Sequence, residues 1–115
     1  SRAALNRDGS LIATPSQIYD SGFNPAAYYS GSADVVPVFS PDGKRLFCYQ
    51  LISGSPDAQA NMVVYDTSQA PVSQQYPVLA TVPVGNRGGA TAAISTNGGT
   101  VFFLGYNGLL VVTAP

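Results

Sequence analysis

The side chains of this sequence that are capable of chemistry are aspartates, tyrosines, a few cations and one cysteine, because histidine and glutamate are both absent. Histidine is the usual general base and the commonest metal ligand. Cys48 lies in the stretch RLFCYQ with no histidine to lower its pKa, so we interpret it as a buried structural thiol. Ser1 has no lysine or aspartate constellation to support it as an N-terminal nucleophile. We therefore expect no catalytic residue in this chain.

The oxygens of aspartate and asparagine are also potential metal ligands. The order Asn6, Asp8, Gly9 resembles part of a calcium loop, but such a loop needs a further oxygen ligand and a later glutamate where Ala4 and Pro15 stand. The sequence has no zinc-ligand spacing, no phosphate loop and no paired carboxylates. We expect neither a metal nor a cofactor, and we interpret these aspartates as residues that cap turns.

Aromatic and cationic side chains in glycine-containing segments are the candidates for binding. Tyr28 and Tyr29 lie in GFNPAAYYSGSAD, where packing is a weaker explanation than it is for tyrosines inside strands. Tyrosine offers a large contact area with a polar tip and is common on binding surfaces. Arg87, in GNRGGA, is placed to contact a carboxylate. Together with Tyr106 these residues form the predicted binding set, with a folded loop and a solvated charge as the alternatives.

Tight turns must position these residues. The stretch VFSPDGKRLF, residues 38–47, places Pro, Asp and Gly between two apolar runs, which is the pattern of a β-hairpin. Proline presets the first corner, aspartate caps the turn, and glycine takes the left-handed backbone conformation. Similar turns occur 34 residues earlier and 55 residues later. The predicted turn residues are Asp8 and Gly9, Asp42 and Gly43, and Asn97 and Gly98.

Strands are the elements that these turns connect. Apolar residues alternate or occur in short runs bounded by Gly, Pro, Asn and Asp, and no stretch has convincing helical spacing. Four strands in meander order are predicted in the central part, at 35–40, 45–52, 61–69 and 78–85. The stretch IYDSG near the start mirrors VYDTS in the third of these strands. We expect one all-β segment over 1–115, with approximate repeats at 1–34, 35–85 and 86–115.

The order of FSPDGKRLF, NMVVYDTSQ, VLATVPVG and a new AAIS resembles the bacterial β-propeller repeats of the YVTN and lactonase-like type. The match covers Val36 to Gly85 well and the flanking repeats in part. The resemblance implies antiparallel four-stranded blades of a β-propeller. Because a propeller typically has four to eight blades, the propeller is expected to be incomplete in this chain. Other blades of a longer chain, or other subunits, are the expected partners.

Composition narrows the function classes. The chain has 115 residues, a charged fraction of 10% and a formal net charge of −1. No basic field is available to hold a nucleic acid or an anionic membrane, and no apolar run approaches the roughly 20 residues of a membrane span. A single cysteine allows no internal disulfide.

We expect a non-catalytic, extracytoplasmic binding or scaffold module that contacts a protein or a glycan through blade loops. Members of the family that it resembles include enzymes, binding modules and structural surface proteins, so the resemblance carries the fold and not the activity. Two alternatives stay open. One is part of a lactonase-like hydrolase whose catalytic residues lie outside this chain. The other is a self-contained β-sandwich with an adhesin-like or structural role.

Overall fold

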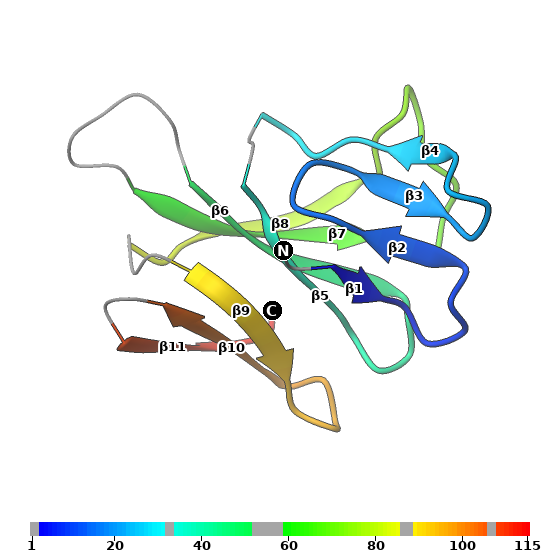
Figure 1. The fold of residues 1–115 in the computed structure, drawn as a ribbon. Helices are drawn as coiled ribbons and strands as arrows, with labels where there is room; N and C mark the ends of the chain where they lie inside the picture. Colours follow the sequence, from blue (N-terminus) through cyan, green and yellow to red (C-terminus); the bar gives the residue numbers. More distant parts are fainter. Residues whose placement is uncertain (1–2, 32–33, 52–58, 86–88, 106–107) are drawn as a thin grey trace.

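The computed structural model describes residues 3–31, 34–51, 59–85, 89–105 and 108–115, and these form three antiparallel sheets (Figure 1). The first sheet contains β1 (Ala4–Leu5), β2 (Leu11–Ala13), β3 (Ile18–Asp20) and β4 (Pro25–Ala27). The middle sheet contains β5 (Val36–Phe39), β6 (Arg45–Leu51), β7 (Ala60–Asp66) and β8 (Val78–Pro83). The third sheet contains β9 (Gly89–Ile94), β10 (Thr100–Gly105) and β11 (Gly108–Thr113).

Each sheet is a meander in which every strand pairs with the next strand in the sequence. The strands are short and bounded by turn residues, and within the described residues no helix occurs. The prediction of an all-β fold built from antiparallel sheets is therefore confirmed. None of the described segments forms a helix of the length and apolarity needed to cross a membrane.

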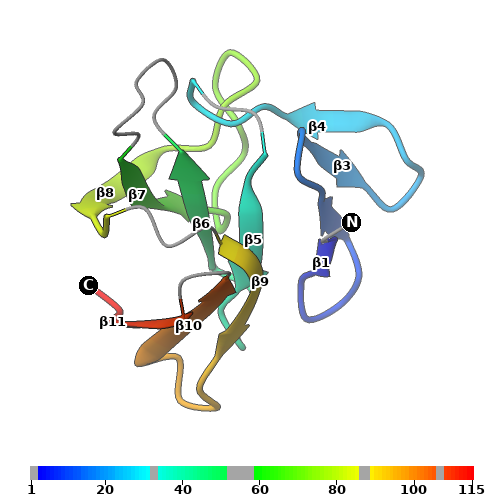
Figure 2. The ribbon, with the colours of Figure 1, turned by 60° about the vertical axis from the view of Figure 1, so that its left-hand side comes forward.

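The three sheets are arranged around their first strands. β5 packs beside both β1 and β9, so the first strand of the middle sheet lies between those of its neighbours (Figure 2). The remaining strands of each sheet follow outward in sequence order. This open stack of three sheets, each with its first strand innermost, is consistent with an incomplete β-propeller or with a β-sandwich.

The middle sheet is covered on both faces by its neighbouring sheets. Its side chains alternate in direction along each strand, so successive residues belong to opposite faces. In β6, Leu46 and Cys48 belong to a core cluster shared with the first sheet. Phe47 and Tyr49 point the other way and belong to a second cluster shared with the third sheet. All four side chains are at most 1% exposed. Cys48 is thus a buried thiol in the described structure, in agreement with its interpretation from the sequence.

The segment around Tyr28 is more ordered than its composition suggested. Residues 25–27, within the stretch that was interpreted as a possible loop, form strand β4 at the outer edge of the first sheet. β4 pairs with β3 through an irregular register, in which Ile18 faces Ala27 and Tyr19 faces Pro25. The strand is short and contains a proline, which is tolerated there because the position is at a sheet edge.

Candidate functional site

The turn after the first strand of each sheet is the most regular feature of the molecule. In all three turns, the amide of the glycine donates to the carbonyl oxygen of the residue three positions earlier, at 3.1 Å for Gly9 and 2.9 Å for Gly43 and Gly98. The three glycines also share a φ of 75°, a left-handed conformation that favours glycine. We call residues 6–10, 40–44 and 95–99 the repeated turns.

The side chain before each glycine caps its own turn. Oδ1 of Asp8, Asp42 and Asn97 accepts the backbone amide two residues later, at 3.0, 2.9 and 2.8 Å respectively. In the second and third turns a serine hydroxyl also donates to this oxygen, from Ser40 at 2.6 Å and from Ser95 at 2.8 Å. The three side chains therefore act as turn caps in the described structure, the role for which the sequence predicted them.

Hydrogen bonding also tunes the carboxylates of these turns. Hydrogen bonds from the side chain of Ser40 and then from the amide of Lys44 lower the pKa of Asp42. Hydrogen bonds from Ser10 lower the pKa of Asp8 in the same way. Both carboxylates are thus held in the ionised form, and each already has its acceptor positions partly occupied by its own turn.

The repeated turns meet at one end of the stack and line an open depression of about 630 Å³. All three turns contribute to its wall, through residues that include Arg7, Asp42, Lys44, Arg45, Thr96 and Asn97. This is the candidate functional site, which we call the turn-end depression. Its position follows from the stack, because adjacent first strands bring their turns together.

Positive charge is concentrated around the turn-end depression. The chain has only five lysines and arginines, and three of them, Arg7, Lys44 and Arg45, line this depression opposite a single carboxylate, that of Asp42. All three cations are exposed. Nη1 of Arg45 donates to the backbone oxygen of Pro115 at 2.8 Å, which fixes this guanidinium beside the third sheet. Arg7 and Lys44 extend from the first and second repeated turns, so the cations converge from different sheets.

The structure places the predicted binding residues in different environments. Tyr28 is 41% exposed, and it does not line the turn-end depression. Its backbone amide donates to the carbonyl oxygen of Gln74 in the β7–β8 connection, at 2.8 Å. Arg87 and Tyr106 lie outside the described residues.

Tyr29 is part of the core and not of the surface. It is 6% exposed, and its hydroxyl donates to the backbone oxygen of Thr14 at 2.6 Å. Its ring lies against that of Tyr65, with centroids 6.0 Å apart. Burial raises the pKa of Tyr29. The pair joins the first sheet to the middle sheet, so among the adjacent tyrosines only Tyr28 is available to a partner.

A small polar network fixes the same junction. The Tyr65 hydroxyl donates to Oε1 of Gln50 at 2.7 Å and accepts the backbone amide of Ser30 at 3.1 Å. Nε2 of Gln50 donates to the carbonyl oxygen of Ser30 at 3.2 Å. Burial, the largest cause, raises the pKa of Tyr65. These hydrogen-bonded groups fix the first sheet against the middle sheet, and we assign them a structural role.

Sequence reasoning missed Arg7, Lys44 and Arg45 as members of one site. A signal was present, because Arg7 and Lys44 lie in two of the repeated turns and Arg45 directly follows the second. Their convergence depends on the stacking of sheets, which no short motif records.

Among the described residues, no group of three or more His, Cys, Asp or Glu side chains is arranged to hold a metal ion. No protein-family model and no curated protein sequence matches this chain.

Proposed function

We propose that this chain is a non-catalytic, extracytoplasmic binding module that holds a carboxylate-bearing protein or glycan at its turn-end depression. The observation that carries the proposal is the convergence of Arg7, Lys44 and Arg45, three of the five cations of the chain, on one open depression. A cleft lined mostly by one sign of charge attracts the opposite charge and raises its local concentration.

The chemistry of the depression suits carboxylates. Arg7 offers a planar guanidinium that can donate two parallel hydrogen bonds to one carboxylate, and Lys44 offers a compact ammonium. Asp42 is engaged by Ser40 and Lys44 of its own turn, and it is the single carboxylate beside three cations among the described residues that line the depression. An acidic protein segment or an acidic glycan would complement this excess of positive charge.

The scaffold is proposed to be a set of propeller blades. The YVTN-like order of motifs over residues 36–85 supports this assignment, and the repeated turns supply a rigid frame for the cations. Rigid side-chain supports lower the entropic cost of binding, because less motion is lost when the partner is held. Tyr28 is the candidate for an additional aromatic contact outside the depression.

Fluorescent poly-glutamate and polygalacturonate are suitable probes, with neutral dextran as the reference, and anisotropy at low salt as the readout. Binding is expected for the two acidic polymers and to weaken as salt is added. Replacing Arg7 and Lys44 together with Gln is expected to weaken binding about fivefold, the scale of two exposed ion pairs.

The matched control exchanges the two cations, Arg7→Lys together with Lys44→Arg, and so keeps both positive charges at the depression. This variant is expected to retain most of the binding, because the net charge of the depression is unchanged. An equal loss in this control, or equal binding of dextran, would remove the depression from the binding function.

A further inference from the structure

The repeated turns define which residues of the middle and third sheets are equivalent. Ser40 and Ser95 occupy the same place in their turns, so Phe47 corresponds to Phe102 and Tyr49 corresponds to Leu104. Strand pairing extends the correspondence outward, because Phe47 faces Val64 and Tyr49 faces Met62, whereas Phe102 faces Val111 and Leu104 faces Leu109. The four residues Phe102, Leu104, Leu109 and Val111 form what we call the outer face of the third sheet.

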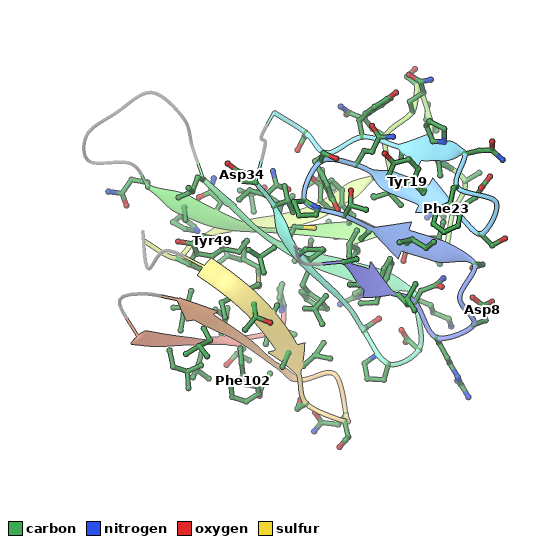
Figure 3. All side chains as sticks on the ribbon, viewed as in Figure 1. Asp8, Tyr19, Phe23, Asp34, Tyr49 and Phe102 are labelled. Atoms are coloured by element: carbon green, nitrogen blue, oxygen red, sulfur yellow. The ribbon has the colours of Figure 1, made fainter. Side chains whose placement is uncertain are left out.

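The two equivalent faces differ sharply in burial. Phe47, Tyr49, Met62 and Val64 are at most 1% exposed, because the third sheet covers them. On the outer face of the third sheet, Leu104, Leu109 and Val111 are 52%, 58% and 55% exposed. Figure 3 shows Tyr49 between the middle and third sheets, and Phe102 on the side of the third sheet that faces away from the middle sheet. A contiguous apolar surface of this kind marks an interaction site.

The first sheet has a complementary open face. Leu5, Ile12 and Tyr19 are neighbours across β1, β2 and β3, and we call them the outer face of the first sheet. By the same turn correspondence they match Phe39, Leu46 and Tyr65, which the first sheet covers in the middle sheet. Leu5 is 64% exposed, and Ile12 and Tyr19 are half-buried.

We propose that a second copy of this chain covers these faces, with the outer face of the first sheet of one copy lying on the outer face of the third sheet of the other. The middle sheet already makes both halves of this contact within the chain, through its two buried faces. The contact between copies continues that interface, and one chain carries both of the surfaces required. The proposal does not depend on the binding function of the turn-end depression.

The symmetry of this contact is head-to-tail, because two different faces meet. Such contacts form rings when the rotation between copies closes. Two copies would place six sheets around one axis, a number within the range of closed propellers. Both apolar faces of each copy would then be buried.

Light scattering across a range of protein concentrations tests the proposal. The chain is expected to form particles of two or more copies, and Leu104→Asp and Leu5→Asp are each expected to be folded monomers by circular dichroism and mass. Leu79→Asp is the matched control, because Leu79 lies on β8 at the edge of the covered middle sheet and is 50% exposed, nearly the same as Leu104. The control is expected to keep the mass of the unaltered chain.

Mixing the two monomeric variants separates a head-to-tail contact from a contact of one face with itself. An equimolar mixture of Leu5→Asp and Leu104→Asp retains one unaltered contact between the two chains, so a two-copy particle is expected to reappear. A monomeric unaltered chain, such as one whose faces another sheet of a longer protein covers, would overturn the proposal. A mixture that stays monomeric, or a control as disruptive as Leu104→Asp, would overturn it as well.

Discussion

The middle and third sheets have the same turn after their first strand, yet their equivalent residues differ in burial. Phe47 is 1% exposed between two sheets, whereas its counterpart Phe102 lies on an open face. Tyr49 is equally buried, whereas its counterpart Leu104 is half exposed. Both strands carry apolar residues on both faces, which is the pattern of a strand that is covered on both sides. The third sheet therefore has the sequence of a sheet covered on both sides, and one of its faces is open in the described structure.

The two sheets share the features that depend on local sequence and differ in the burial that depends on neighbouring sheets. The turns, the strand pairing and the alternation of side chains are local and recur in both sheets. Burial depends on the next sheet in the stack, so it differs between sheets that are locally alike. Three pairs and one series of substitutions break or sharpen this contrast, in order of decreasing effect.

The largest difference is expected between Phe47→Ala and Phe102→Ala. Removing a fully buried aromatic ring costs about 3–5 kcal/mol of unfolding free energy, because the side chain is lost from a packed core and leaves a cavity. Replacing Phe102, which lies on the open face, is expected to lower the unfolding free energy by about 1 kcal/mol. Urea unfolding in the Leu104→Asp background, which keeps the open face uncovered, measures both. Equal losses would show that the third sheet is already covered.

The second contrast concerns the tyrosine that precedes the strand-ending aspartate in two sheets. Tyr65→Phe removes the hydroxyl that joins Gln50 and Ser30, so that Oε1 of the buried Gln50 loses its donor, and is expected to cost about 1–2 kcal/mol. Tyr19→Phe, on the outer face of the first sheet, is expected to change stability by less than about 0.5 kcal/mol. The readout is the midpoint of urea unfolding, and a larger loss for Tyr19→Phe would contradict the assignment.

The third contrast tests whether the repeated turns are equivalent. Gly9→Ala, Gly43→Ala and Gly98→Ala each place a Cβ at a φ of 75°, and each is expected to cost about 1 kcal/mol. Asparagine tolerates this conformation better, so Gly98→Asn is expected to cost less than Gly98→Ala. Thermal and urea unfolding would measure the series. A threefold spread among the three alanine variants would contradict the equivalence of the turns.

The smallest effect is expected from the exchange of caps between turns. The folded-state pKa of Asp42 is lowered, so its stabilising contribution is present above the ordinary aspartate pKa and is lost as the pH falls through the lower folded value. Asp42→Asn imitates the turn of Asn97 and is expected to flatten the loss of stability below about pH 4. Asn97→Asp should steepen it. Unfolding free energies measured from pH 2 to 6 give both slopes, and unchanged slopes would remove the carboxylate from the acid response.

The sequence was sufficient to predict the features that depend on near neighbours. Asp42-Gly43 and Asn97-Gly98 form the predicted turns because their conformation is specified by the turn residues themselves. Tyr29 was not predicted as core, because it is buried in a cluster that includes Tyr65, which lies 36 positions later, in the middle sheet. Strand β4 was missed because a three-residue edge strand that contains proline has no periodic signal.

The candidate site could not be predicted from the sequence. Arg7 and Lys44 lie in turns that are 34 residues apart, and only the stacking of the first strands brings them to one depression. The open faces are also invisible in the sequence, since Phe102 and Phe47 occur in equally apolar strands. Their difference is a property of the stack.

Hydrogen exchange of the amides of Phe47 in β6 and Phe102 in β10, measured at low and high protein concentration, tests most directly whether a missing neighbour causes the difference. Both strands are flanked by a strand on each side, so strand pairing alone protects them similarly. At low concentration the amide of Phe102 is expected to exchange faster than that of Phe47, and to slow toward it as a second copy covers the third sheet. Equal protection at low concentration, or no change at Phe102 as concentration rises, would contradict this explanation.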